Sequence, residues 1–274
     1  MDWDWGSKQT GSGPALYQSF MAPGMFQPFA EVLVEALRIE PGERVLDVAC
    51  GTGVVSRAAA VRAGTDGSVT GVDLGAPMLE VARSQPTGEG AAEITYLEGS
   101  ADSLPVGDQE FDVVLCQQGF QFFPDRPAAL GEMRRALLSG GRLGITTWAE
   151  LERNPVIAAI ASGLAHNLGE EVGQMMHAPF SLHDPDELHG LAEDAGFTDV
   201  EVRERTMETS FPSHQKAART IVLAGPIAPT FSAASEEIQR AYERETTESL
   251  AGLATDDGGL RAPMTTLELL AVSP

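Results

Sequence analysis

Two carboxylates and a glycine-rich turn lie close together in this chain, at the spacing that a nucleotide-type cofactor needs. The apolar run 45–48 contains Asp47 and leads into the turn ACGTG, and Asp73 follows twenty residues after Gly53. Glycines in such a turn let the backbone approach a ligand closely, and the amides of the next helix can face a carboxylate. An acid after the second strand can accept from ribose hydroxyls. The pattern predicts a cofactor site at one edge of a parallel sheet.

The order of residues in the turn discriminates between two cofactor classes. A dinucleotide turn usually continues to a third glycine, but Ser56 holds that position here. Beyond the two glycines Gly51 and Gly53, the loop offers nothing that would bind a pyrophosphate. The turn therefore favours S-adenosylmethionine, with Asp47 accepting from loop amides or from the ammonium group of an amino acid. The alternative interpretation is a plain strand–helix turn that needs its glycines for packing.

Further candidate cofactor contacts follow the second and third strands. Leu74 and Met78 would pack beside adenine or ribose, although apolar residues there suit a core equally well. Asp102 could accept from the adenine amino group while the amide of Ala101 meets a ring nitrogen. The alternative for Asp102 is an Asx-turn leading into Pro105.

Candidate substrate contacts lie in two other segments. Gln117 follows the fourth strand and could touch cofactor backbone or substrate, and Gln118 and Phe120 come directly after it. In the aromatic, methionine-bearing N-terminal segment, Tyr17 and Phe20 are the candidates. Aromatic residues at such positions are also common structural elements.

Strand and helix patterns alternate strictly through the middle of the chain. Apolar runs predict strands at 45–48, 67–72, 94–98, 111–116 and 142–148. Helical patterns fall between them at 54–63, 77–83 and 126–138, the last with glycines 140 and 141 as its stop. This alternation predicts a doubly wound α/β fold, whose strand-end loops share one edge of the sheet.

We expect a single domain with additions rather than two independent domains. Residues 1–30 form an N-terminal lid segment that is broken by prolines 23 and 28. Residues 31–148 are the cofactor-binding core, and 149–198 are a helical cap or substrate insertion. Residues 199–274 supply the C-terminal strands and helices that complete the same domain.

The motifs VLDVACGTG, GVDLGAPMLEVAR, EGSADSLP, FDVVLCQQGFQFFPD and LLSGGRLGITTW resemble the class I S-adenosylmethionine-dependent methyltransferases. The nearest branch includes the ubiquinone/menaquinone C-methyltransferases and many small-molecule O-, N- and C-methyltransferases. The resemblance covers residues 31–148 and implies a Rossmann-like, seven-stranded sheet, mostly parallel with an antiparallel last strand. It also implies that S-adenosyl-L-methionine is the cofactor and that the site residues have the following roles: Asp47, Gly51 and Gly53 at the methionine end, Asp73 at the ribose, Ala101 and Asp102 at the adenine. Ala49, also a cofactor contact, departs from the family, in which many members have glycine.

Methyl transfer from a sulfonium is an in-line displacement that needs a general base only where the acceptor must lose a proton. The five histidines all lie beyond residue 165, and none has metal-ligand spacing. We expect His177 and His183, which flank the apolar segment APFSL, as the catalytic candidates. The N-terminal segment and the 149–183 insertion are rich in apolar residues, so a lid over an apolar or aromatic small-molecule methyl acceptor is expected. A packing strap across the sheet edge is the alternative.

Composition excludes several classes of partner. The 40 acids outnumber the 18 lysines and arginines, giving a net charge of −22, so a nucleic acid would be repelled. Two isolated cysteines indicate a reducing compartment, and no long apolar run predicts a membrane span. We therefore expect a cytoplasmic protein with no membrane or nucleic-acid partner, and the sequence leaves a homodimer open.

Two other functions remain compatible with the motifs, because they report the cofactor and not the reaction. One is an enzyme that binds S-adenosylmethionine without transferring its methyl group, such as a cyclase. The other is an NAD-dependent oxidoreductase, against which the missing third glycine counts.

Overall fold

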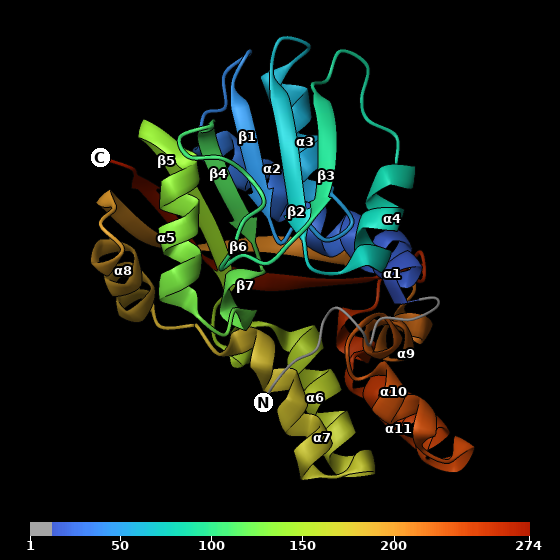
Figure 1. The fold of residues 1–274 in the computed structure, drawn as a ribbon. Coiled ribbons are helices and arrows are strands. Elements are labelled where there is room, and N and C mark those ends of the chain that lie inside the picture. The colour runs from blue at the N-terminus through green and yellow to red at the C-terminus, as the bar shows by residue number, and fades with distance from the viewer. Residues whose placement is uncertain (1–12) are drawn as a thin grey trace.

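A seven-stranded sheet forms the centre of the protein, whose residues 13–274 a computed structural model describes (Figure 1). The strand order is β3-β2-β1-β4-β5-β7-β6. The strands are β1 (Arg44–Val48), β2 (Ser68–Asp73), β3 (Glu93–Glu98), β4 (Phe111–Gln117), β5 (Leu137–Trp148), β6 (Thr198–Phe211) and β7 (Leu260–Val272).

The sheet is parallel except at β7. The pairs β1–β2, β1–β4, β2–β3 and β4–β5 are parallel, whereas β7 runs antiparallel to both of its neighbours, β5 and β6. The last strand in the chain, β7, therefore lies between β5 and β6 and runs in the opposite direction to both. The predicted Rossmann-like sheet, mostly parallel with an antiparallel last strand, is confirmed.

Helices cover both faces of the sheet. On one face lie α2 (Gln27–Ala36) and α3 (Val54–Ala63), which bury small and branched apolar side chains against β1 and β4. On the other face lie α5 (Arg126–Ala136) and α8 (Pro185–Asp194), over a second apolar cluster that includes Leu46, Val114 and Leu269. At the β3 edge, α4 (Ala76–Ser84) connects β2 to β3.

The remaining helices gather beyond one end of the sheet (Figure 1). They are α6 (Pro155–Leu168), α7 (Glu170–Gln174), the 3₁₀ turn η4 (Met175–Phe180), α9 (His214–Ala224), α10 (Ala228–Ala233) and α11 (Glu236–Ser249). Three short 3₁₀ turns complete the chain: η2 (Phe120–Phe122), η3 (Leu151–Arg153) and η5 (Ala251–Leu253). The helical cap is thus built from two segments of the chain, one before β6 and one after it. Helices α6 and α11 pack closely where they meet, since a Cβ at Gly163 would lie 2.1 Å from the Thr246 hydroxyl.

The chain between α5 and β5 differs from its prediction. The helix ends at Ala136 and the strand begins at once with Leu137, five residues before the predicted start at Arg142. Leu137 is 1% exposed and pairs with Phe111 across the sheet. Because Leu137 is buried in its pairing with β4, the helix ends before the two glycines and the strand runs through them.

From residue 13 on, the N-terminal segment is continuously helical, whereas the sequence predicted breaks at its prolines. After α1 (Gly13–Leu16), the segment Tyr17–Phe26 winds as a π-helix, η1, and continues directly into α2. The amide of Gln27 donates to the carbonyl of Ala22, five residues back. The wider π turn tolerates Pro23 inside the helix, which an α-helix would not do without a kink.

Gly24 allows η1 to touch β6. A Cβ at this position would lie 1.7 Å from the carbonyl oxygen of Ser210, so only glycine permits this approach. The close contact fixes the N-terminal helix against the far edge of the sheet.

No helix within residues 13–274 is both long and apolar enough to cross a membrane. The part of the predicted lid formed by residues 1–12 lies outside the described residues.

Gly24→Ala should destabilise the protein, because the new methyl group must push η1 away from the β6 backbone. Overpacking of this kind costs about 1–3 kcal/mol in free energy of unfolding. Gly131→Ala is the matched control: Gly131 lies in α5 with nothing within 4 Å of its added Cβ, so alanine there should be neutral or stabilising. Urea denaturation of both variants measures the difference, and equal stabilities would contradict the role of Gly24.

Candidate active site

The carboxyl ends of β1, β2 and β4 border a cavity of about 380 Å³. One part of its wall is made of strand-end loops and the other of apolar side chains from helices. The loop part comprises Ala49, Gly51, Asp73, Leu74, Gly75, Met78, Gly99, Ser100, Ala101, Asp102, Gln117 and Gln118. Ligands of open α/β sheets bind at this edge.

Asp73 joins two of these loops. Its carboxylate accepts from the amide of Gly51 at 2.7 Å and from the amide of Gly75 at 2.7 Å. Burial raises the pKa of Asp73, and the two amide donors lower it in part by favouring the charged form. The acid at the end of β2 therefore sets the position of the glycine turn after β1.

The two glycines of the turn have different reasons to be glycine. Both adopt positive φ, 55° at Gly51 and 77° at Gly53, which side chains disfavour. A Cβ on Gly51 would meet nothing within 4 Å, since this glycine borders the cavity. A Cβ on Gly53 would meet the hydroxyl of Tyr96 at 2.2 Å, so Gly53 serves packing and does not line the cavity.

Asp47 lies beneath the turn and is 1% exposed. Its Oδ2 accepts from the hydroxyl of Ser56 at 2.6 Å, and its Oδ1 has no hydrogen-bond partner. Burial, with a smaller contribution from the charge of Asp73, raises the pKa of Asp47 to about 7. Asp47 thus ties β1 to α3 and does not itself line the cavity.

The end of β4 carries buried glutamines. Gln117 donates from Nε2 to the carbonyl of Phe26 at 3.0 Å, which fastens η1 to the sheet and leaves Oε1 without a partner. Gln118, which is 7% exposed, has φ of 57°, and Ala49 at the end of β1 has the same value. Positive φ in residues with side chains is costly and clusters at functional sites. Both backbone positions border the cavity.

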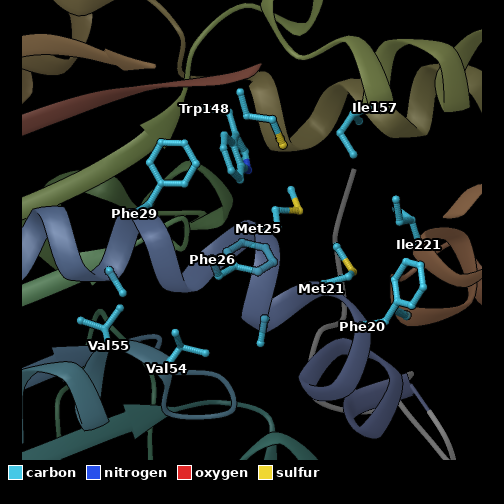
Figure 2. Close-up of a cluster of buried hydrophobic side chains, with 14 of the residues drawn as sticks. Phe20, Met21, Met25, Phe26, Phe29, Val54, Val55, Trp148, Ile157 and Ile221 are labelled. Carbon is cyan, nitrogen blue, oxygen red and sulfur yellow. The ribbon is translucent and has the colours of Figure 1, made fainter. Parts of the chain in front are cut away.

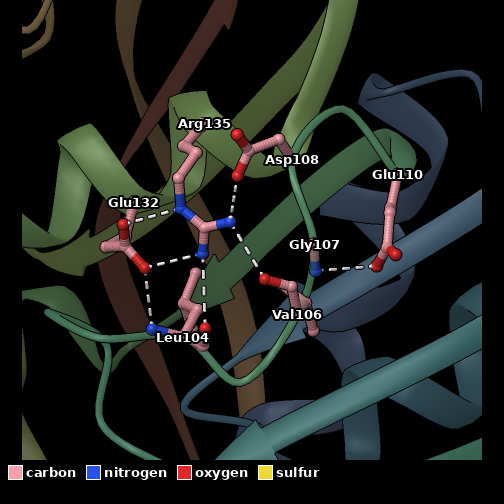
Figure 3. Close-up of polar contacts among 7 residues, drawn as sticks. All are labelled: Leu104, Val106, Gly107, Asp108, Glu110, Glu132 and Arg135. Carbon is pink, nitrogen blue, oxygen red and sulfur yellow. Dashed lines mark hydrogen bonds and ion pairs between the residues drawn. The ribbon is translucent and has the colours of Figure 1, made fainter.

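A clamp holds the loop that carries Ala101 and Asp102 (Figure 3). The guanidinium of Arg135 on α5 donates to the carboxylates of Glu132 and Asp108 and to two loop carbonyls, those of Leu104 and Val106. Glu132 in turn accepts from the amide of Leu104 at 2.9 Å, and its pKa is lowered by Arg135. The loop after β3 is therefore fixed by two side chains of α5.

The apolar part of the cavity is built around Trp148, at the end of β5 (Figure 2). Phe29 meets its ring edge-on with centroids 5.5 Å apart, and Phe26 and Phe180 lie at 6.1 Å and 6.5 Å. The lining here comprises Tyr17, Met21, Met25, Phe26, Trp148, Ile157, Met175, Met176, Phe180, Ile221, Val222 and Ile227.

The π winding of η1 decides which of its side chains face this cavity. Tyr17 stacks on Phe26 with ring centroids 4.9 Å apart, nine positions along the chain. Nine residues are about two and a half α-helical turns, so an α-helix would place these rings on opposite faces. Burial raises the pKa of Tyr17, with a further contribution from Asp73, so its hydroxyl stays protonated at neutral pH.

The structure brings ten of the sixteen predicted site residues to the cavity. They are Tyr17, Ala49, Gly51, Asp73, Leu74, Met78, Ala101, Asp102, Gln117 and Gln118. Besides Asp47 and Gly53, the cavity lining lacks the following residues: Phe20, Phe120, His177 and His183.

These four side chains have other surroundings. Phe20 packs near Phe211 at 6.0 Å between centroids, and Phe120 is fully buried edge-on against Phe123. His177 and His183 are exposed, and a ring nitrogen of His183 lies 2.7 Å from the carbonyl of Phe180. A catalytic role for either histidine has no support from this geometry.

Sequence reasoning missed most of the helical wall. Trp148, Ile157, Phe180 and Ile221 come from β5, α6, η4 and α9, and nothing in their local pattern distinguishes them from core residues. The nearest available signal was the density of methionine and phenylalanine in the segments flanking residues 23 and 179.

A protein-family model described as "Methyltransferase domain" matches residues 45–141. A ubiquinone/menaquinone biosynthesis C-methyltransferase of Xanthomonas campestris is 31% identical over 193 residues, covering 66% of this chain and 76% of that protein.

Solved structures share the fold. A structure titled as a putative methyltransferase from Bacillus halodurans aligns with a TM-score of 0.57 and 22% identity, over 89% of this chain and 98% of that chain. A Haemonchus contortus phosphoethanolamine N-methyltransferase 2 complex with S-adenosylhomocysteine aligns with a TM-score of 0.60 and 20% identity. The alignment covers 98% of this chain and 58% of that chain. The chain therefore belongs to the class I S-adenosylmethionine-dependent methyltransferases, enzymes whose cofactor is S-adenosyl-L-methionine.

Proposed function

We propose that this enzyme methylates a small, uncharged, apolar or aromatic metabolite. The observation that carries the proposal is the two-part cavity: loops with backbone and carboxylate groups form one side, and aromatic and methionine side chains form the other. A cofactor and an apolar acceptor can thus meet in one cavity.

The loop side suits the cofactor. Gly51 presents a bare Cα to the cavity, and the unpartnered Oε1 of Gln117 offers an acceptor to the cofactor's ammonium group. We assign Asp73 to the ribose hydroxyls and Ala101 with Asp102 to the adenine. S-adenosyl-L-methionine supplies a methyl group already activated by its sulfonium. The protein's part is to align the acceptor and exclude water.

The helical side argues for an acceptor without charge. The titratable side chains in the cavity lining are Tyr17, Asp73, Asp102 and Asp125, so no lysine, arginine or histidine among the described residues contributes to it. An anionic acceptor would lack a counter-charge and would meet a protein of net charge −22. Apolar and aromatic acceptors fill the same wall favourably.

The acceptor atom follows from the lack of a base in this lining. Tyr17 keeps its proton, the carboxylates of Asp73 and Asp102 lie on the cofactor side, and that of Asp125 caps α5 by accepting from the amide of Ala128. The acceptor must therefore bring its own nucleophile. An electron-rich ring carbon of an uncharged acceptor meets that requirement. Since the Xanthomonas relative is named as a C-methyltransferase of quinone biosynthesis, we favour a ring carbon of a quinol-like compound.

We propose that η1 and η4 close the apolar half of the cavity. Both segments line it, and the bond from Gln117 to the carbonyl of Phe26 anchors η1 at its inner end. Residues 1–30 and 149–198 would then act as lid and cap of one domain.

The buried free thiols Cys50 and Cys116 support a reducing compartment, for which we propose the cytoplasm.

Asp73→Ala should weaken binding of S-adenosylmethionine by about tenfold or more, because ribose hydroxyls and two loop amides lose their acceptor. Calorimetric titration measures the dissociation constants of S-adenosylmethionine and S-adenosylhomocysteine. Asp194→Ala, at an exposed site in α8, is the control and should bind normally. An unchanged affinity in Asp73→Ala would remove this carboxylate from the cofactor site.

Asp47→Asn should gain stability over the parent as the pH rises. Since burial raises the pKa of Asp47 from 3.8 to about 7, its protonated form stabilises the fold fully below about pH 4. That contribution is lost as the pH rises through about 7, whereas asparagine is neutral throughout.

Free energies of unfolding at pH 5 and pH 8 test this expectation. The advantage of Asp47→Asn should grow by about 1 kcal/mol or more between the two values. Asp194→Asn controls for the loss of one carboxylate from the protein. A pH-independent difference for Asp47→Asn would show that its carboxylate is not held in this way.

An acceptor panel tests the substrate class. Hydroxynaphthalenes and quinols should yield S-adenosylhomocysteine at least about tenfold faster than phosphoethanolamine, because burying the phosphate without a counter-charge is costly. Ile221→Glu, within the cavity wall, should abolish that preference while retaining affinity for S-adenosylhomocysteine. Ile238→Glu, on an exposed face of α11, should behave as the parent. Faster methylation of phosphoethanolamine would refute the proposal.

A further inference from the structure

Among the residues that line the cavity, Gln118 has a buried side-chain donor without a hydrogen-bond partner in the described protein. Gln118 lines the cavity and is 7% exposed, and its side-chain Nε2 is buried without a hydrogen-bond partner. An amide nitrogen left unpaired in such a place costs free energy comparable to a lost hydrogen bond. The remaining requirement of this residue is an oxygen or nitrogen acceptor supplied from the cavity.

The orientation of the Gln118 amide follows from its neighbour. Gln121, which is 3% exposed, donates from Nε2 to the backbone carbonyl of Gln118 at 3.0 Å and reaches its Oε1 at 3.5 Å. Side-chain oxygen and nitrogen are assigned from such networks. Because Oε1 of Gln118 faces the donor of Gln121, its Nε2 is left to serve as the donor toward a ligand.

The backbone holds this side chain in place. Gln118 adopts φ of 57°, and its amide donates to the carbonyl of Thr146 on β5 at 2.9 Å. The next residue must be small, because a Cβ on Gly119 would lie 2.6 Å from the Cβ of Ala49. A strained conformation that is fixed on both sides positions one side chain at the cavity.

Gln118 stands at the seam between the two parts of the cavity. On one side, Gly119 touches Ala49 at the start of the glycine turn. On the other, the carbonyl of Gln121 accepts from the hydroxyl of Ser181, directly after the η4 turn whose Phe180 lines the apolar wall. A group bound to Gln118 would therefore belong to an acceptor lying between cofactor and aromatic wall.

We propose that Gln118 is a specificity-determining residue that donates a hydrogen bond to an oxygen on the ring of the methyl acceptor. This proposal rests on the apolar, aromatic acceptor proposed above and narrows it to oxygenated rings, such as phenols, quinols and quinones. A neutral amide suits such an oxygen, because it donates a hydrogen bond to a polar atom on an uncharged ring and carries no positive charge that would attract phosphates or carboxylates. Hydrocarbon rings of the same shape leave the amide unpaired and bind less well.

The test compares 2-naphthol with 2-methylnaphthalene, which differ by a hydroxyl in place of a methyl group. Calorimetry with S-adenosylhomocysteine at saturation gives the ratio of their two dissociation constants. In Gln118→Met, which removes the amide but retains the length of the side chain, the ratio should shift against naphthol by about fivefold. An unchanged ratio overturns the proposal.

Gln109→Met is the matched control. Gln109 is also a glutamine with positive φ, 53°, but it lies exposed in the loop before β4. Its replacement carries the same backbone cost and should leave the ratio of the parent protein unchanged. A shift of equal size in this control would overturn the assignment to Gln118.

A measurement on the parent protein does not depend on the folding of any variant. After labelling of glutamine side chains with ¹⁵N, a side-chain amide resonance should shift with 2-naphthol and not with 2-methylnaphthalene. The absence of this difference, with both probes bound, overturns the role of Gln118 alone. Failure of both probes to bind overturns the aromatic acceptor itself, and the proposal falls with it.

Discussion

The carboxylate of Asp73 is the interaction on which the site depends. By accepting from the amides of Gly51 and Gly75, it ties the loop after β1 to the loop after β2. The cost of its burial is offset in part by these two donors, and its position determines where Gly51 borders the cavity. Other contacts fix the remaining loops: the amide of Gly99 donates to the carbonyl of Asp73 at 3.1 Å, Arg135 holds the β3 loop to α5, and Gly119 at the β4 end contacts Ala49.

A division of labour follows from this arrangement. Parallel strands deliver polar and backbone groups to one edge of the sheet, as the fold requires of any member, and helices from three distant segments cover that edge with apolar side chains. The sheet side is suited to a constant ligand, and the helical side can vary in shape and chemistry. In this chain the helical side is rich in methionine, an adaptable side chain suited to irregular apolar ligands.

The strand-end side of the cavity was predictable, because its information is local. Asp73 and Gln117 each follow an apolar strand directly, and parallel strands bring such positions together. The helical side was not, since Trp148 and Ile221 come to line one cavity only through tertiary packing, and His183 is exposed although its loop borders the cavity. The helix break expected at Pro23 was wrong because π winding, invisible to α-helical periodicity, accommodates the proline. Spacing alone also could not reveal that the side chain of Tyr96 leaves no room for a Cβ at Gly53.

The π-helix has a consequence for how this protein can diversify. In such a segment a given length of helix axis holds more residues than in an α-helix, so loss of Pro23, which an α-helix would not accommodate, can return one turn of it to α winding. All side chains before the deletion would then rotate about the axis, and Tyr17 would leave the ring of Phe26. One codon deletion would thereby exchange a whole row of cavity-facing residues while the sheet and the cofactor loops stay untouched. Insertions and deletions here offer evolution a shorter route to a new acceptor than successive point substitutions.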